Sequence, residues 1–188
     1  IFRMNRPKPP GALEAAASLG KGLDKLIIFN SLSKRSNASG MRAGFIAGDK
    51  NIIESYKLLV SNGASPVPIP IQKVAASLYA DEEHHTKACI HYDKNFSIVE
   101  KYLKPFYKDF KLPDAGFFLW LKVRDDQQAA KILWNKFSLR VMPGSFMGIN
   151  VQGFNPGKGF LRISLVDNKE VIEEAMKRIQ LFLQSEIS

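Results

Sequence analysis

The spacing of apolar residues in the first half of the chain predicts strands and helices in alternation. Two short apolar runs are typical of neighbouring buried strands, and Asp49 is expected to cap the helix that follows them. Closely spaced prolines then predict an extended crossing. The predicted elements are strands at 26–29 and 43–48, a helix from 49 to 63, an extended segment at 66–70, and helices at 71–79 and about 82–103.

The second half of the chain mixes shorter strands with helices, a pattern typical of an α+β layer. Pro105 is expected to end the long helix, and Asn168 is expected to cap a last helix whose apolar stripe faces a core. The predicted elements are strands at 117–123, 139–142 and 159–166, and helices at 125–137 and from 168 onward. The chain as a whole is therefore expected to have an α/β fold.

The charge of the chain is strongly basic but dispersed. Its 27 Lys and Arg residues against 18 Asp and Glu residues give a formal charge of +9. Because acidic residues stand among the lysines, a solvated surface is favoured over a nucleic-acid or membrane patch. A basic interaction module without a cofactor stays open as an alternative function, and it would bind nucleic acid in a salt-sensitive way.

The cysteine content and the hydropathy favour a cytoplasmic protein. Cys89 is the only cysteine, so no internal disulfide can form, and it is expected to be a small buried hydrophobe. No apolar run is long enough to span a bilayer, and no charged-then-apolar leader opens the chain.

A lysine flanked by hydroxyl groups lies between the first two predicted strands. The amine of Lys34 could bond covalently to an aldehyde cofactor and also act as a general base. Ser31, Ser33 and Arg42 could hold a phosphate. This needs the chain to turn back after Gly40, and the glycines at 40 and 44 permit that turn. The same residues also fit a solvated surface loop, where lysines and arginines usually lie.

Arg162 is a second candidate because it interrupts an apolar strand. Leu161 and Ile163 imply one alternating set, so Arg162 shares the opposite face with Ser164. Burying a guanidinium group is costly without an anion, and a carboxylate would bind it through two hydrogen bonds. An arginine that faces water on an edge strand is the alternative.

Other conspicuous residues are expected to have structural roles. The histidines at 84, 85 and 91 fall on a lysine-rich helix without a complete ligand set, so surface positions are favoured over a metal site. Trp120 and Trp134 are expected in the core.

Four segments resemble one enzyme family. The segment FNSLSKRSNASGMRAGFIAGD at 29–49 closely resembles the cofactor-lysine signature of class I/II pyridoxal-phosphate aminotransferases. Three later segments resemble, in family order, the small-domain strand, the substrate-side loop and the strand of the carboxylate-binding arginine. They are PDAGFFLWL at 113–121, MPGSFMG at 142–148 and FLRISL at 160–165.

The resemblance implies a cofactor site and a substrate site. Lys34 would carry pyridoxal 5'-phosphate and move a proton during transamination. Ser31, Ser33 and Arg42 would bind the cofactor phosphate. Arg162 would bind the substrate α-carboxylate. The implied partners are small amino and oxo acids, with neither nucleic acid nor membrane, and the implied assembly is a homodimer.

The resemblance also implies a domain organisation. Residues 1–103 would be the C-terminal part of the large PLP-dependent transferase domain, ending in a long interdomain helix, and residues 104–188 the small C-terminal α+β domain. In the family, an aspartate for the pyridine nitrogen, a tyrosine, a stacking aromatic ring and a glycine-rich phosphate turn precede the lysine segment. We therefore expect the chain to be a C-terminal fragment that is inactive alone.

The lysine motif further indicates a substrate. Within the family, Ser-Lys-Arg-Ser-Asn at 33–37 is most similar to succinyldiaminopimelate aminotransferases of bacterial lysine biosynthesis. That similarity implies glutamate as amino donor and N-succinyl-2-amino-6-oxopimelate as acceptor. An aspartate, alanine or aromatic aminotransferase, or a carbon–sulfur lyase of the same fold, stays open because the lysine and arginine roles would be identical.

Overall fold

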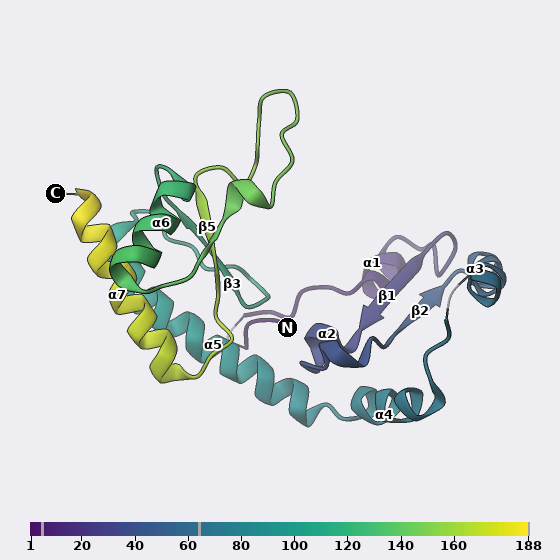
Figure 1. The fold of residues 1–188 in the computed structure, drawn as a ribbon. Coiled ribbons are helices and arrows are strands. Elements are labelled where there is room, and N and C mark those ends of the chain that lie inside the picture. The colour runs from purple at the N-terminus through teal and green to yellow at the C-terminus, as the bar shows by residue number, and fades with distance from the viewer. Residues whose placement is uncertain (5, 64, 188) are drawn as a thin grey trace. The chain divides into compact units, whose positions relative to one another are not determined.

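The computed structural model describes residues 1–4, 6–63 and 65–187 (Figure 1). Internal contacts divide the chain into a first unit, Ile1 with Pro7–Cys89, and a second unit, Phe2–Arg6 with Ile90–Ser188. Both units combine helices with strands, as the α/β prediction requires. Among the described helices, none is both long and apolar enough to cross a membrane.

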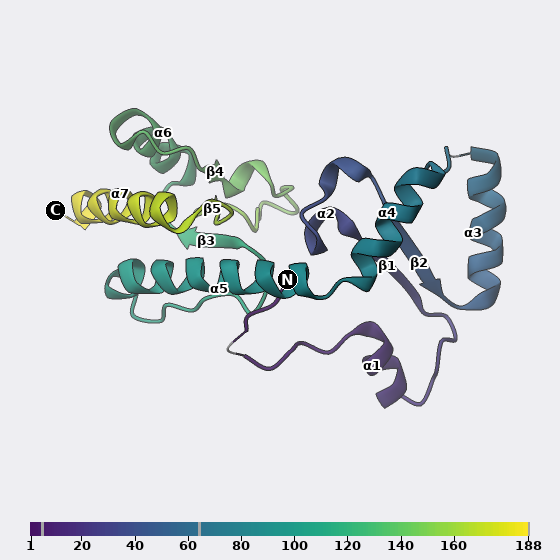
Figure 2. The same cartoon turned by 90° about the horizontal axis from the view of Figure 1, so that it is seen from below.

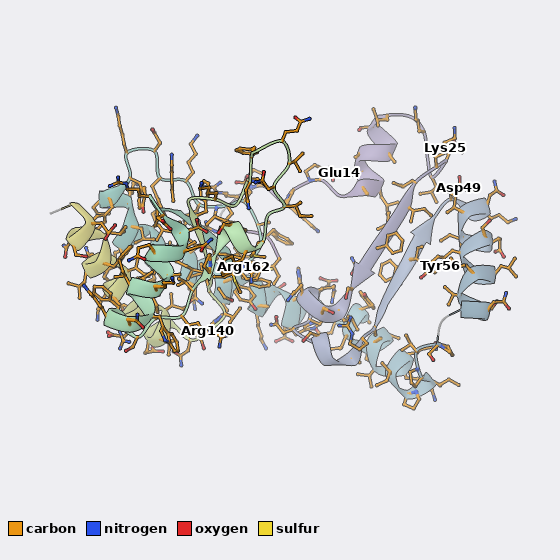
Figure 3. All side chains as sticks on the ribbon, turned by 45° about the horizontal axis from the view of Figure 1, so that its top comes forward. Glu14, Lys25, Asp49, Tyr56, Arg140 and Arg162 are labelled. Carbon is orange, nitrogen blue, oxygen red and sulfur yellow. The ribbon has the colours of Figure 1, made fainter. Side chains whose placement is uncertain are left out.

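The first unit holds a strand pair with helices around it. Its helix α3 begins directly after Asp49, whose Oδ1 accepts hydrogen bonds from Asn51 N at 2.8 Å and Ile52 N at 3.3 Å, so the predicted cap is confirmed (Figure 3). The elements are α1 (Ala12–Ser18), β1 (Ile27–Ser31), α2 (Leu32–Arg35), η1 (Ser39–Met41), β2 (Gly44–Gly48), α3 (Lys50–Gly63), α4 (Ile69–Ala80) and the first part of α5 (Glu83–Leu103).

Helix α4 begins two residues earlier than its predicted range of 71–79. Pro70 lies in its first turn, where a residue without an amide hydrogen is tolerated because that hydrogen would have no helical partner. The extended crossing therefore ends at Pro68, which precedes the helix as its N-cap.

Strands β1 and β2 are neighbours, as predicted, and pair antiparallel with Ser31 opposite Gly44. A Cβ atom at Gly44 would lie 2.3 Å from Asn30 O, so this close approach requires glycine. The prediction that both strands are buried is wrong, since Phe29 is 71% and Phe45 46% exposed. In the described chain the two strands form a sheet by themselves, with no third strand beside them.

The uncovered apolar surface of the first unit predicts self-association of the 188-residue chain produced by itself. Exposed apolar side chains in such number usually mark a contact with other protein. The exposed large apolar side chains on β1, β2 and α3 are Phe29, Phe45, Ile52, Tyr56, Leu58 and Leu59. Sedimentation velocity should give a weight-average mass that rises with concentration, and Phe29→Ser with Leu59→Ser should reduce the rise. A mass that stays monomeric across the concentration range would contradict the expectation.

The second unit packs a small sheet against three helices (Figure 2). Within the described residues the strand order is β3-β5-β4, all antiparallel. One face of the sheet packs against α5, α6 and α7. Its buried side chains are Leu119, Leu121, Leu161 and Ile163. The elements are the rest of α5, η2 (Lys104–Phe106), β3 (Phe118–Lys122), α6 (Asp126–Phe137), β4 (Met142–Pro143), η3 (Gly144–Phe146), β5 (Phe160–Ser164) and α7 (Lys169–Ile187).

Most boundaries of the second unit follow the sequence pattern. Helix α5 stops where Pro105 enters η2, and Asn168 accepts from Val171 N at 3.0 Å to cap α7, so both predictions are confirmed. The strand predicted at 139–142 is wrong in extent, because pairing with β5 begins only at Met142 and ends at Pro143. Proline has no amide hydrogen for further pairing.

The segment 144–159, which begins with η3 and leads to β5, is held by close backbone contacts. A Cβ atom at Gly157 would lie 2.0 Å from Gly144 O, and one at Gly144 would lie 2.3 Å from Gly157 O, so each glycine excludes a side chain on the other. Asn155 donates from Nδ2 to Ser145 O at 3.0 Å and accepts from Gly157 N at 2.9 Å. No sequence motif predicts a role for Asn155, which joins Ser145 to Gly157 across the segment.

Asp126 anchors the same segment, and its removal should destabilise the second unit. The buried carboxylate accepts from Ser145 N at 2.8 Å and Gly159 N at 3.1 Å. Asp126→Ala should lower the free energy of unfolding by about 2–4 kcal/mol, because two amides lose their acceptor. Urea unfolding of the complete protein would measure this, with Asp125→Ala, which removes an exposed helix cap, as a control that should cost about 1 kcal/mol.

The effect of Asp126 should also depend on pH. Burial raises the pKa of Asp126, but the hydrogen bonds from Ser145 and Gly159 outweigh it, so the pKa is lowered overall. A carboxyl group with a lowered folded-state pKa stabilises the fold above its unfolded pKa and loses that contribution as pH falls through the folded value. The difference between wild type and Asp126→Ala should therefore shrink below about pH 4. An unchanged difference there would contradict the ionised state of Asp126.

Candidate functional site

The turn that carries Lys34 begins directly at the end of β1. Ser31 caps α2, since its Oγ accepts from Ser33 N at 3.2 Å, and the two hydroxyl oxygens lie 3.0 Å apart. Leu32 is fully buried against Ala43 and Ala75 and fixes the base of this short helix. The exposed Lys34 follows on α2.

The turn back to β2 is made without glycine in the left-handed region. Of the two glycines predicted to permit the turn, Gly44 is required by its close approach to Asn30 O, but Gly40 is not, because the residues with positive φ there are Asn37 at 53° and Arg42 at 49°. Asparagine tolerates this conformation, whereas an arginine in it is uncommon and is held by its surroundings. The exposed Arg42 side chain donates from Nη1 to Ser39 O at 3.0 Å.

The two residues that follow Lys34, Arg35 and Ser36, form hydrogen bonds with the junction between α4 and α5. Arg35 donates from Nη1 to Leu78 O at 2.8 Å, and Ser36 Oγ lies 2.8 Å from Nε2 of His84. The prediction of surface histidines is wrong for His84 and His85, whose side chains are 26% and 13% exposed, because α5 begins against this turn. Sequence reasoning missed the contacts of Arg35 and Ser36.

The other sequence predictions for histidine and cysteine have separate outcomes. Cys89 is buried, as predicted, with its Sγ 3.7 Å from Nε2 of His85. His91, also predicted at the surface, is half-buried, and its Nε2 lies 3.4 Å from Val166 O. Within the described ranges no group of three or more His, Cys, Asp or Glu side chains is arranged to hold a metal ion.

Arg162 lies on the central strand of the second unit's sheet (Figure 3). The alternative of an edge-strand arginine is therefore wrong, since β5 pairs with both β3 and β4. The half-buried guanidinium carbon lies 4.5 Å from the ring centre of Phe118, a cation–π contact. Among the described residues, no acidic side chain is ion-paired with it.

The sheet face that holds Arg162 is aromatic and open. Trp120 lies opposite Arg162 in the register of β3 and β5 and is 46% exposed, and Trp134 is 59% exposed. The prediction that both tryptophans are core residues is wrong. Alternation on β3 buries Leu119 and Leu121 in place of Trp120, and Trp134 lies on α6 with its side chain exposed.

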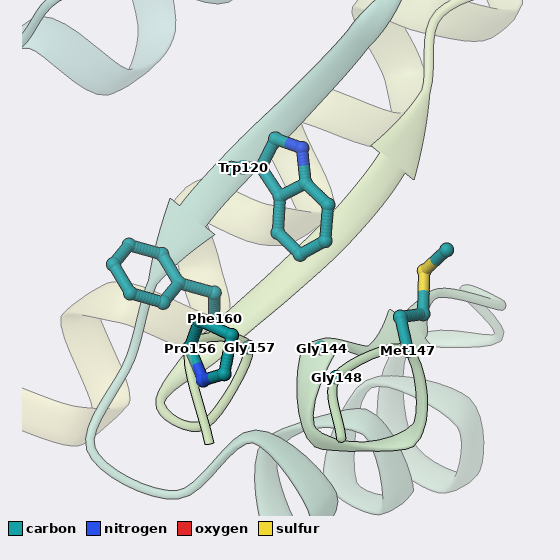
Figure 4. Close-up of a pocket in the computed structure, with 7 residues that line it drawn as sticks. All are labelled: Trp120, Gly144, Met147, Gly148, Pro156, Gly157 and Phe160. Carbon is teal, nitrogen blue, oxygen red and sulfur yellow. The ribbon is translucent and has the colours of Figure 1, made fainter. Parts of the chain in front are cut away.

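A pocket of about 440 Å³ opens on this face beside Trp120 (Figure 4). Its lining contains no ionisable side chain, so it offers apolar and aromatic contacts. The lining residues are Trp120, Gly144, Met147, Gly148, Pro156, Gly157 and Phe160.

The sequence candidates are thus distributed over both units. The first unit brings Ser31, Ser33 and Lys34 together on one turn, and the β1–β2 register places Arg42 two residues before the partner of Ser31. Arg162 belongs to the second unit. The donors of the first unit fit a phosphorylated aldehyde, because hydroxyls and a guanidinium suit phosphate oxygens and a primary amine suits an aldehyde carbon.

The fold is that of aminotransferases, as the comparison with solved structures shows. An aminotransferase from Neisseria meningitidis Z2491 superposes with a TM-score of 0.88 at 37% sequence identity, over 96% of this chain and 47% of that one. The sequence model of aminotransferase class I and II matches residues 6–179, so the chain belongs to this family. Members of the family use pyridoxal phosphate.

Curated relatives act on different substrates. LL-diaminopimelate aminotransferase 2 of Nostoc sp. is 29% identical over 177 residues, which cover 92% of this chain and 43% of the relative. The (5-formylfuran-3-yl)methyl phosphate transaminase of Methanocaldococcus jannaschii is 28% identical over 177 residues, covering 92% and 46%. The chain therefore spans about half the length of the relatives it matches.

Proposed function

We propose that the complete protein containing this chain is a pyridoxal-phosphate-dependent aminotransferase in which Lys34 holds the cofactor. The Lys34 turn carries the proposal. It presents a primary amine directly after two hydroxyl groups that lie 3.0 Å apart. Arg42, in an uncommon left-handed conformation, follows on the same loop. Family membership supports this reading over a basic module without cofactor.

The residues of the turn have separate tasks in this proposal. When bound, pyridoxal phosphate supplies an electron sink that stabilises negative charge at the substrate Cα. Ser31 and Ser33 donate hydroxyl hydrogens to the phosphate, and Arg42 adds a planar pair of N–H donors. With the phosphate held in this way, the Lys34 amine would remove a proton from the substrate Cα and return it.

Arg162 is proposed to bind the carboxylate group of the substrate. Its guanidinium group binds the α-carboxylate of the amino or oxo acid through two parallel hydrogen bonds. The ring of Phe118 beneath the guanidinium restricts its orientation. Residues 1–103 and 104–188 are proposed as the cofactor-binding part and the small domain, and the complete protein is proposed to be a homodimer.

The cofactor assignment is tested by the absorbance spectrum of the complete protein mixed with pyridoxal phosphate. We expect a visible band, and borohydride reduction followed by peptide mapping should place the label on Lys34. Absence of both band and label would refute the proposed function. Salt-sensitive nucleic-acid binding by the same preparation would then favour the basic module.

We further propose glutamate as amino donor and N-succinyl-2-amino-6-oxopimelate as acceptor. The proposal is supported by the Ser-Lys-Arg-Ser-Asn motif at 33–37 and by relatives named as LL-diaminopimelate aminotransferases. Because the pocket beside Trp120 has no ionisable lining residue, the distal carboxylates of this acceptor would need other side chains.

A panel of acceptors separates the substrate candidates. With glutamate as donor, the initial rate should be highest for the succinylated acceptor, compared with tetrahydrodipicolinate, oxaloacetate, pyruvate and phenylpyruvate. A higher kcat/KM for any other acceptor would replace the succinyl assignment and leave the cofactor assignment intact.

A further inference from the structure

The backbone just after Lys34 is anchored by a half-buried guanidinium group. The Arg35 side chain is 16% exposed and donates to Leu78 O, the carbonyl of a residue in the last turn of α4. It also pairs with Glu82 Oε1 at 2.6 Å, and its guanidinium carbon lies 5.5 Å from the ring centre of Tyr79. These contacts fasten the C-terminal end of α2 to the α4–α5 junction.

Ser36 makes a second attachment to the same junction. Its Oγ lies 2.8 Å from Nε2 of His84, and Nδ1 of His84 lies 2.9 Å from Oδ2 of Asp81. The other carboxylate oxygen of Asp81 accepts from Glu83 N at 2.8 Å, at the start of α5. Asp81 is thus fixed by the helix and in turn faces the imidazole.

The contact between Ser36 and His84 does not depend on which nitrogen of the imidazole carries the hydrogen. Nε2 accepts from the Ser36 hydroxyl group when the hydrogen is on Nδ1, and it donates to Ser36 Oγ when it carries the hydrogen itself, because a hydroxyl group can both donate and accept.

We propose that His84 and Asp81 are positioning residues for the cofactor lysine, acting through Ser36 two residues after Lys34. The inference rests on the proposed function of Lys34. The cap of Ser31 fixes the start of α2, whereas Arg35 and the Ser36–His84–Asp81 chain fix its end. A helix of four residues has too few internal hydrogen bonds to hold its own orientation, so these side chains fix the backbone from which the Lys34 side chain extends.

The test compares His84→Ala and Ser36→Ala with Lys87→Ala in the complete protein. Lys87 is an exposed residue of the same helix, paired with Glu83, and serves as the matched control. We expect the two variants at the turn to weaken pyridoxal phosphate binding about tenfold, as for loss of one partly buried hydrogen bond. Hydrogen exchange of peptides covering 32–38, measured without cofactor, should become faster in both.

Conservative variants and a double variant keep the test specific. His84→Gln and Ser36→Thr retain a hydrogen-bonding partner and should restore most of the affinity. The double alanine variant should lose no more affinity than either single variant, because both remove one contact. Faster exchange with unchanged cofactor affinity would show a merely structural role and overturn the proposal, as would no difference from Lys87→Ala. The proposed function is decided separately, by the absorbance band and borohydride label of the wild-type protein with pyridoxal phosphate.

Discussion

Replacing Lys34 by alanine in the complete protein should abolish the borohydride-stable label and lower kcat by at least about 10³-fold. The variant loses both the covalent attachment and the proton carrier, and no other group on the turn replaces a primary amine. Because Lys34 is exposed on a four-residue helix, the fold should survive, which circular dichroism would check.

Two comparisons make the Lys34 result specific. Lys57→Ala removes an exposed lysine of the same unit, paired with Glu54 at 2.8 Å, and should leave both label and rate unchanged. Added methylamine should restore part of the rate of Lys34→Ala, since a free amine can take over the proton transfer. A labelled peptide other than that of Lys34 would move the cofactor site elsewhere.

Arg162→Ala should lower kcat/KM for amino acid donors by about 10- to 100-fold, the loss expected for hydrogen bonds to a charged group. The loss should appear mainly in KM if the α-carboxylate is bound equally in the ground and transition states. Arg162→Lys should recover only part of it, because an ammonium group cannot form two parallel bonds to a carboxylate. Steady-state rates with glutamate as the varied donor would measure kcat/KM and KM.

A control separates this role of Arg162 from its role in the sheet. Arg140→Ala removes an exposed arginine of the same unit and should leave KM unchanged. The cation–π contact with Phe118 contributes about 0.5–1 kcal/mol to stability, so Arg162→Ala should also lower the melting temperature slightly. An unchanged KM with lowered stability would make Arg162 a structural residue only.

The sequence predicted elements well wherever local chemistry decides. Asp49 and Asn168 cap their helices as expected, because a side-chain acceptor ahead of an apolar periodic run needs no distant partner. It predicted exposure poorly at Phe29, Trp120 and Trp134, because burial depends on which layer covers a face, and periodicity does not contain that information.

The candidate site shows the same limit. Lys34 and Arg162 were found through local segments that resemble a family. The contact between Ser36 and His84 was not, since the two residues meet across 48 residues of chain and the motif around Ser36 does not indicate its distant partner. Contacts of this kind follow from how α5 begins against α2, which single-sequence patterns cannot specify.

The facing glycines of the segment 144–159 also restrict how the protein can evolve. Gly144 and Gly157 each occupy the space of the other's Cβ, so a side chain at either position forces the same backbone separation. Once one replacement has opened that gap, the second adds little cost, and the two losses should be less than additive. Single-step evolution therefore keeps both glycines, while paired replacement becomes accessible only to lineages that already tolerate an opened loop.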